Sequence, residues 1–249
     1  MNSFWQSVEN PFVLSKGVIE FCTLLLLRQR GNIRMTILEM MQHLTKEEQQ
    51  TVRSAQDLAT RAHAHQVRDS GEPYITHPEA VFFRLCHEQA DADTLAAAWL
   101  HDVVEDTDVT LDSIREQFGE TIAFFVEGLT KGPRQLNEPK ELYRTRQNHR
   151  LLDYVMQDPR IGLIKCCDRL HNIQTLSAKP RTKQITYANE TVTFFVPLCE
   201  QLGFSSLQEE MEPWAFYFLQ PQRYENSWEK VITTAFAVNT LSTLKTNLS

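Results

Sequence analysis

Hydrophobic residues recur at helical spacing along most of the chain, and the strict alternation that is typical of strands is absent. Thr45 and Glu48 have the spacing of a capping box, which predicts the start of a helix. Asp93 is expected to cap a second, alanine-rich helix. The predicted helices cover 45–65, 78–85, 94–105, 110–118, 120–130, 139–157, 159–177, 183–202 and 205–219. This pattern predicts an all-α fold.

The same pattern divides the chain into three parts. We expect one main helical domain over 45–220, between an N-terminal extension at 1–44 and a C-terminal helical tail at 221–249. Residues 18–27 are apolar, but they are too few to span a membrane and lack the small-residue cleavage site of a signal peptide. We interpret them as part of an extra amphipathic helix. The sequence leaves open whether translation starts at Met35.

Composition disfavours several classes of protein. The net charge of −7 argues against binding to nucleic acid, and there is no glycine-rich phosphate loop of the kinase or GTPase kind. The 5 cysteines are odd in number and include no CxxC pair, which disfavours a disulfide framework and a structural zinc site. We interpret the adjacent Cys166 and Cys167 as reduced core residues. A cytoplasmic protein with neither a membrane nor a nucleic-acid partner is therefore expected.

The stretch GEPYITHP places a histidine where the backbone is restricted. Pro78 limits the residue before it to an extended conformation and is itself suited to the first turn of a helix. We therefore expect His77 to be held stiffly at a loop-to-helix junction.

A second histidine follows the apolar run LAAAWL. His101 and Asp102 come first, and Glu105 and Asp106 follow one helical turn later. Carboxylates crowded at one helix end repel one another, and a bound cation removes that repulsion. For this motif alone, a solvated acidic helix end is the simpler explanation.

Asp168 changes the balance in favour of a metal. It lies within an apolar helical pattern, where an aspartate is costly unless it is paired or binds metal. The neighbouring Arg169 does not face it on a helix. Together with His77, His101 and Asp102, it makes a mixed nitrogen and oxygen set that suits Mn, Fe, Co, Ni or Zn.

Five blocks of the sequence carry a family resemblance. In order, they are VRDSGEPYITHP, AAWLHDVVEDTDVT, FGETIAFFVEGLTK, IKCCDRLHNIQTL and ANETVTFFVPLCEQLGF. They cover about 55–205 and resemble the hydrolase domain of RelA/SpoT alarmone enzymes, within the HD superfamily of metal-dependent phosphohydrolases. The resemblance implies hydrolysis of the 3′-pyrophosphate of (p)ppGpp to GDP or GTP, with Mn²⁺ as cofactor, in the stringent response.

The resemblance also implies roles for individual residues. The implied metal ligands are His77, His101, Asp102 and Asp168, and the implied catalytic carboxylates, which orient or deprotonate the attacking water, are Glu105 and Asp106. The implied substrate contacts are Arg68 and Ser70 at the base, Asn172 and Thr175 at the ribose, and Lys140, Lys183 and Tyr187 at the phosphates.

The distribution of charge agrees with a doubly pyrophosphorylated nucleotide. Residues 88–120 carry 10 acidic residues and 1 arginine, whereas residues 131–150 carry 6 basic residues and 2 acidic ones. An acidic metal cradle beside a basic stretch suits such a substrate. Without the family resemblance, a solvated helix face explains the basic stretch equally well.

Two departures from the family leave questions open. Asp69 stands where bifunctional relatives often carry a basic residue, which leaves the preference between guanine and adenine undecided. The tail at 221–249 is too short for a pyrophosphokinase domain, so we expect a small stand-alone alarmone hydrolase.

Several alternatives remain open from the sequence. One is a related substrate, either (p)ppApp or the 2′-phosphate of NADPH. Another is a role as antitoxin to a small alarmone synthetase, and a third is a catalytically inactive regulatory module. The expected partner is a nucleotide substrate, while association with a second copy of the chain or with a synthetase stays undecided.

Overall fold

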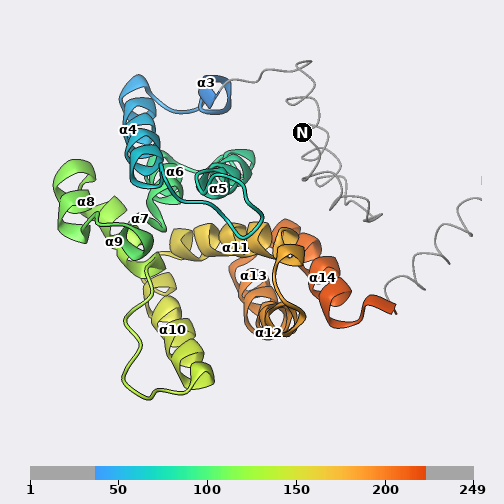
Figure 1. The fold of residues 1–249 in the computed structure, drawn as a ribbon. Helices are drawn as coiled ribbons and strands as arrows, with labels where there is room; N and C mark the ends of the chain where they lie inside the picture. Colours follow the sequence, from blue (N-terminus) through green and yellow to red (C-terminus); the bar gives the residue numbers. More distant parts are fainter. Residues whose placement is uncertain (1–36, 223–249) are drawn as a thin grey trace, which may run out of the picture.

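The computed structural model describes residues 37–222, and the regular structure in that range is helical (Figure 1). The all-α prediction is confirmed, because the β structure in that range is limited to one isolated bridge between Val67 and Pro73. The predictions made for 1–36 and for 223–249 lie outside the described residues.

The helices follow the predicted order along the chain. In that order they are α3 (Ile37–Met40), α4 (Lys46–Ala62), α5 (Thr76–His87), α6 (Ala92–Leu100), α7 (Val103–Asp106), α8 (Leu111–Phe118), α9 (Glu120–Leu129), α10 (Lys140–Val155), α11 (Pro159–Gln174), the 3₁₀-helix η1 (Leu176–Ala178), α12 (Arg181–Glu190), the π-helix η2 (Thr191–Phe195), α13 (Val196–Leu202) and α14 (Ser205–Leu219).

Local capping signals account for several of these starts. The predicted capping box is present at α4, where the Thr45 hydroxyl accepts from the backbone N–H of Glu48 and the Thr45 backbone N–H donates to the Glu48 carboxylate. The cap of α6 was predicted two residues too late. Asp91, not Asp93, accepts from the backbone N–H of Thr94, at 2.9 Å.

Three of the predicted helices differ in their bounds from those observed. α5 begins at Thr76, two residues before the predicted start, so His77 lies in the first turn of a helix and not in the preceding loop. The predicted helix over 94–105 is divided, because His101 and Asp102 form a turn between α6 and α7. The predicted helix over 183–202 is likewise interrupted by η2, just before Pro197, which has no N–H to continue an α-helical ladder.

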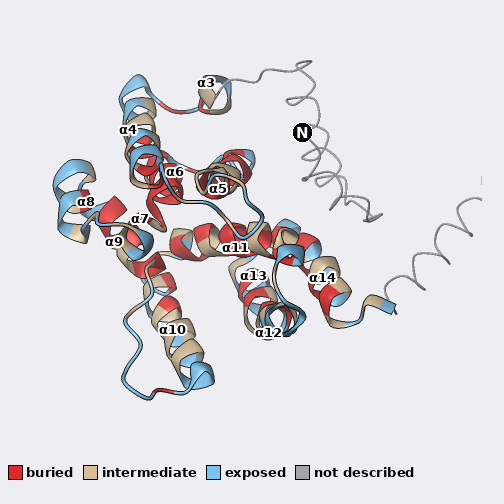
Figure 2. Ribbon diagram, in the orientation of Figure 1, coloured by how far each residue is buried: buried red, intermediate tan, exposed pale blue. Residues whose placement is uncertain are grey.

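The core is organised around α11, which passes through the middle of the molecule and contacts α5, α6, α10, α13 and α14 (Figure 1). Both α6 and α11 are largely buried (Figure 2). Gly162 permits part of this packing, since a Cβ there would lie 2.6 Å from Leu202 of α13. The prediction that Cys166 and Cys167 are reduced core residues is confirmed, because both are buried free thiols.

Within 37–222, every helix is either too short or too polar to cross a lipid bilayer.

Candidate active site

Two histidines and an aspartate converge from three helical segments. His77 comes from the first turn of α5, His101 from the turn after α6, and Asp168 from the middle of α11. Their ligand atoms all lie within 4.8 Å of one another, and all three residues are buried. His77 Nε2 is 3.0 Å from Asp168 Oδ1 and 3.2 Å from His101 Nε2. This arrangement allows one ion to contact all three side chains.

Asp102 adjoins this cluster through the two histidines. Its Oδ2 lies 3.2 Å from His101 Nε2 and 3.6 Å from His77 Nε2. The structure therefore brings the fourth sequence-predicted ligand to the two imidazoles.

Hydrogen bonds on the far side of each imidazole indicate which nitrogen is free. His101 Nδ1 lies 2.8 Å from the carbonyl oxygen of Ala98, so it donates there and leaves the Nε2 lone pair free. His77 Nδ1 lies 2.7 Å from Nδ1 of His171, whose ring stacks on His77 with centroids 4.9 Å apart. Once both imidazoles are neutral and His77 donates to His171, two Nε2 lone pairs face each other beside carboxylates. A divalent cation fits this donor set, because it removes the repulsion between the lone pairs.

Without a metal, electrostatics favour neutral imidazoles at His77 and His171, an ionised carboxylate at Asp168 and a protonated imidazole at His101. Burial lowers the pKa of His77, and burial together with nearby positive charge lowers the pKa of His171 well below its usual value. Burial also opposes ionisation of Asp168, but Lys165, whose Nζ is 2.8 Å from Oδ2, and the histidines hold the pKa of that carboxyl well below its usual range. Burial opposes charging of His101, yet the adjacent carboxylates raise its pKa to about 9. Metal binding there therefore displaces a proton.

The two sequence-predicted catalytic carboxylates lie at the mouth of this cluster and are held by residues that the sequence analysis missed. The Tyr74 hydroxyl lies 2.8 Å from Asp106 Oδ2 and 2.6 Å from Asp102 Oδ2. Its single proton can serve only one of these carboxylates at a time. The Lys131 ammonium donates to Glu105 Oε1 at 2.7 Å. Tyr74 precedes His77 by three residues in the GEPYITHP stretch, and this proximity is the one signal that pointed to it.

A cavity of about 250 Å³ opens beside the cluster and contains the predicted base and ribose contacts. Arg68 lines it and donates to Asn172 Oδ1 at 3.0 Å and to Thr175 Oγ1 at 3.1 Å. Ser70 and Asp69 line the same cavity. The four predicted base and ribose contacts, which come from two separate blocks of the sequence, thus line one cavity.

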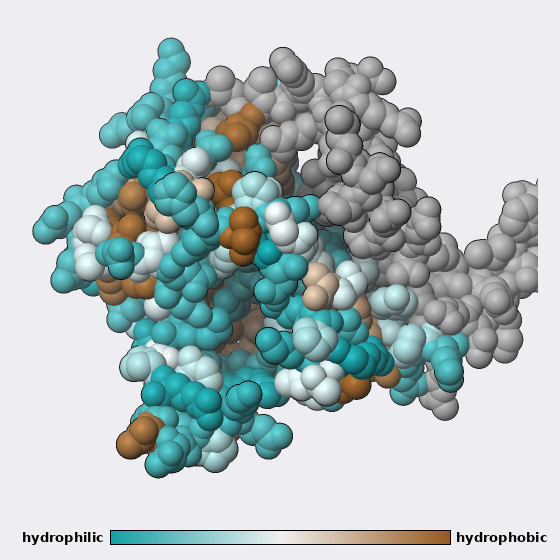
Figure 3. Space-filling model, viewed as in Figure 1, coloured by the Kyte–Doolittle hydropathy of each residue, from teal (hydrophilic) through white to brown (hydrophobic). Residues whose placement is uncertain are grey.

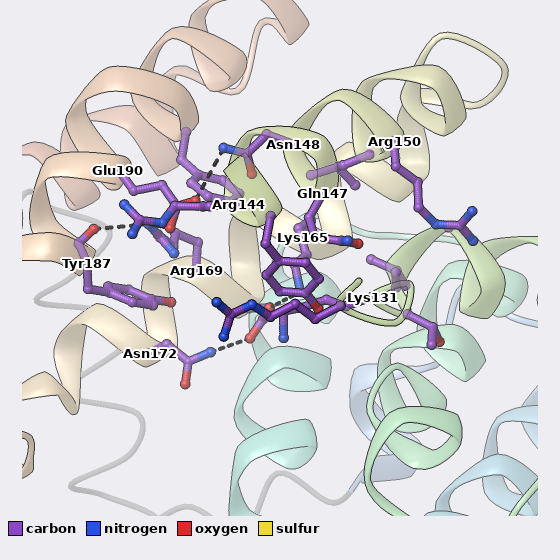
Figure 4. A pocket seen from close by; sticks show the side chains of 18 of the residues that line it. Lys131, Arg144, Gln147, Asn148, Arg150, Lys165, Arg169, Asn172, Tyr187 and Glu190 are labelled. Carbon is purple, nitrogen blue, oxygen red and sulfur yellow. Dashed lines mark hydrogen bonds and ion pairs between the residues drawn. The ribbon is translucent and has the colours of Figure 1, made fainter. Parts of the chain in front are cut away.

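A second cavity, of about 490 Å³, lies on the other side of Asp168, between α10 and the helices α11 and α12. Figure 3 shows the corresponding hollow in a largely hydrophilic face, and Figure 4 shows side chains of α10, α11 and α12 turned towards it. Its basic lining residues are Lys131, Arg134, Lys140, Arg144, Arg150, Lys165 and Arg169.

The structure separates the three predicted phosphate contacts. Lys140 and Tyr187 line the cation-rich cavity, and the Arg169 guanidinium lies 3.5 Å from the centre of the Tyr187 ring. Lys183 is exposed on α12 and lines neither of the two cavities described above. Most of the other basic residues of the larger cavity were not predicted as substrate contacts, because they come from a basic stretch that contains no recognisable motif.

A helical fold that brings buried histidines and an aspartate to one possible metal site is typical of metal-dependent enzymes. The HD domain family matches residues 55–205, and the chain belongs to that family. The predicted resemblance is confirmed, and the HD domain implies a divalent metal at the cluster formed by His77, His101 and Asp168.

Similar proteins carry names that refer to alarmones. The chain is 40% identical over 175 residues, which is 70% of this chain and 25% of the relative, to the guanosine-3′,5′-bis(diphosphate) 3′-pyrophosphohydrolase of Aquifex aeolicus (strain VF5). It is 37% identical over 182 residues, or 73% of this chain and 26% of the relative, to the bifunctional (p)ppGpp synthase/hydrolase SpoT of Escherichia coli (strain K12). The chain thus spans only about a quarter of the length of these relatives.

A solved structure supports the fold. It is described as a metazoan ortholog of SpoT that hydrolyzes ppGpp and plays a role in starvation responses, and it matches with a TM-score of 0.53 at 23% sequence identity. The match covers 67% of this chain and 93% of that one. At this level of identity, the likeness shows a shared fold.

Proposed function

We propose that this chain hydrolyses the 3′-pyrophosphate of (p)ppGpp, releasing pyrophosphate and leaving GDP or GTP, with Mn²⁺ as the metal. The names of the relatives from Aquifex aeolicus and Escherichia coli support the substrate. We further propose that 45–220 forms the hydrolase domain, between separate N-terminal and C-terminal extensions.

The observation that carries the proposal is the shared wall of the two cavities. Lys131, Lys165, Asp168 and Asn172 line both of them. A nucleotide that carries phosphates at both its 5′ and 3′ positions needs a metal, a base site and an extended basic surface in contact with one another. A metal at Asp168, a base in the smaller cavity and phosphates along the larger one would meet that need, and the shared wall supports the proposal.

The metal would be held by His77, His101, Asp102 and Asp168. When bound, it would supply charge stabilisation for the phosphoryl oxygens and lower the pKa of water. The remaining chemistry belongs to the protein's own side chains. Arg68, which donates hydrogen bonds to Asn172 and Thr175, has a guanidinium plane suited to an aromatic base. Asn172 and Thr175 would contact ribose hydroxyls.

Glu105 and Asp106 handle the attacking water. The water oxygen forms a bond to the phosphorus nearest the ribose, and the bond from that phosphorus to the 3′ oxygen breaks. One of these two carboxylates takes a proton from the water, and the departing 3′ oxygen gains a proton. The reaction therefore consumes one water molecule in total. Tyr74 positions Asp106, and Lys131 positions Glu105, through the hydrogen bonds already described.

The experiment incubates metal-free protein with ppGpp or pppGpp after addition of Mn²⁺, Mg²⁺ or Zn²⁺, with and without chelator, and identifies products by ion-exchange chromatography. We expect GDP or GTP plus pyrophosphate, with the highest rate in Mn²⁺. The matched pair Asp106→Asn and Asp108→Asn tests the assignment within one segment, since Asp108 is exposed and lines neither cavity. Fully metal-loaded protein that forms no GDP contradicts the proposal.

A further inference from the structure

We propose that Asp69 and Lys179 together recognise the Watson–Crick edge of guanine and make this chain selective for guanine over adenine nucleotides. The inference rests on the proposed function and deepens it, because the sequence left the choice of base open.

Charge assigns the base to the smaller cavity. The cation-rich cavity is lined by seven basic and two acidic side chains, which suits pyrophosphate groups. The smaller cavity is lined by four basic and five acidic side chains, and its basic residues are engaged with neighbours. Arg68 bonds to Asn172 and Thr175, and Lys179 bonds to Asp69. Because Asp168 of the metal cluster lines both cavities, the phosphates can extend from the metal into the larger one while the base occupies the smaller one.

The Asp69 and Lys179 pair lies on the wall of that smaller cavity and stays accessible to a ligand. The two side chains are 59% and 40% exposed, respectively. The Lys179 ammonium donates to Asp69 Oδ2, and no hydrogen bond to Oδ1 comes from residues 37–222. The pair thus presents two carboxylate acceptors next to an ammonium donor.

This order of groups complements guanine and opposes adenine. Guanine offers two donors, the 2-amino group and N1–H, followed by the acceptor O6, so the carboxylate can accept twice while the ammonium donates once. Adenine has no 2-amino group, and its N1 lone pair would face a carboxylate oxygen. Asp69 therefore supplies a base-reading carboxylate on the wall of this cavity.

A contribution to folding stability does not explain the ion pair between Asp69 and Lys179. Asp69 lies in the connection between α4 and α5, and Lys179 follows η1, so neither side chain is part of the buried core. Exposed ion pairs contribute little to folding. Substitution at either position should therefore leave the fold intact, which makes the pair accessible to a clean test.

The test measures kcat/KM for ppGpp and for ppApp, in parallel with equilibrium binding of GDP and ADP, in the Mn²⁺-loaded wild type and in the variants Asp69→Asn and Lys179→Gln. Asp57→Asn, an exposed substitution on α4 outside both cavities, serves as the control. We expect wild type and control to favour guanine by about 10- to 100-fold, the range for one bidentate base contact. Asp69→Asn should bring the ratio close to one, and Lys179→Gln should lower it partly.

The ratio separates base reading from general charge effects, because freeing Lys179 alters phosphate affinity equally for both nucleotides. Equal wild-type preference for the two bases, or a guanine preference that Asp69→Asn leaves unchanged, overturns the inference while the hydrolase proposal stands. The opposite result is also possible. If the protein does not hydrolyse ppGpp but binds GDP selectively, and Asp69→Asn abolishes that selectivity, the base-reading inference holds and the proposed reaction fails.

Discussion

The two cavities that meet at Asp168 are built in opposite ways. On the metal side, the reactive groups are hydrogen-bonded to residues from other segments of the chain, as with His77 to His171 and Asp106 to Tyr74. On the cation-rich side, many of the basic residues come from α10 and the loop before it and are exposed or half-buried, including Lys140 and Arg144.

This difference separates two tasks. Mutually hydrogen-bonded groups keep their geometry before a ligand arrives, as metal binding and proton transfer require. Side chains on a solvated helix supply charge without fixed geometry, which suits flexible phosphate chains. Changes on the metal side should therefore alter metal content and turnover, whereas changes on the cation-rich side should alter substrate affinity alone.

The largest effect is expected for Asp168→Asn. The change removes a metal ligand and leaves the Lys165 ammonium, 2.8 Å away, facing a neutral amide. Charge stabilisation by a metal is worth several kcal/mol, so kcat/KM should fall by at least about 10³-fold. Metal analysis of the purified variant should show loss of the bound ion. Asp153→Asn, exposed on α10, should change neither quantity, and a variant at Asp168 with full metal content and activity would remove the basis for the contrast.

An intermediate effect is expected at His171. His171→Phe keeps a ring stacked against His77 but removes the hydrogen bond to its Nδ1. Loss of such a partner typically weakens metal affinity about 10- to 100-fold. Calorimetric titration of metal-free protein with Mn²⁺ measures this directly. His171→Gln keeps an acceptor and should lose less affinity, so equal losses in both variants would point to ring packing and not to the hydrogen bond.

The smallest effect is expected for Arg144→Met in the cation-rich cavity. Removal of one charged contact should raise KM about tenfold and leave kcat within about twofold, because the contact is equally strong in the ground and transition states. The difference in KM from wild type should shrink as salt is added. Steady-state kinetics with ppGpp at several ionic strengths provides the measurement, with Arg61→Met on α4 as the control. A large fall in kcat would show that this cavity also has a fixed catalytic geometry.

Local sequence signals predicted much of the fold because their partners lie within one helical turn. The capping box at Thr45 and the cap at Thr110 are examples, since each bonds to a backbone N–H three residues later. The error at α6 shows the limit of such signals. Two aspartates, Asp91 and Asp93, lie just before or within the first turn of this helix, and the local pattern does not distinguish them. Asp91 also accepts a hydrogen bond from Arg160 of α11 at 2.7 Å, and this contact is 69 residues away in the sequence.

The start of α5 is a similar case. Pro78 was taken as the first helical residue because the residue before a proline usually avoids the helical conformation. In the structure, the backbone N–H of Thr76 bonds to the carbonyl of Pro73 and that of His77 to the carbonyl of Tyr74, so the chain is already turning before Pro78. These bonds place His77 in the first buried turn.

By itself, the sequence determined the all-helical class, most of the helices and the identity of the chemically capable residues, because helical periodicity, capping and adjacent pairs such as His101 and Asp102 depend on near neighbours. Only the tertiary structure decided which of these residues meet, which partners hold them and where the two cavities join. The physical reason is that a hydrogen bond such as the one between His77 and His171, 94 residues apart, exists only after packing around α11 has brought its two ends together.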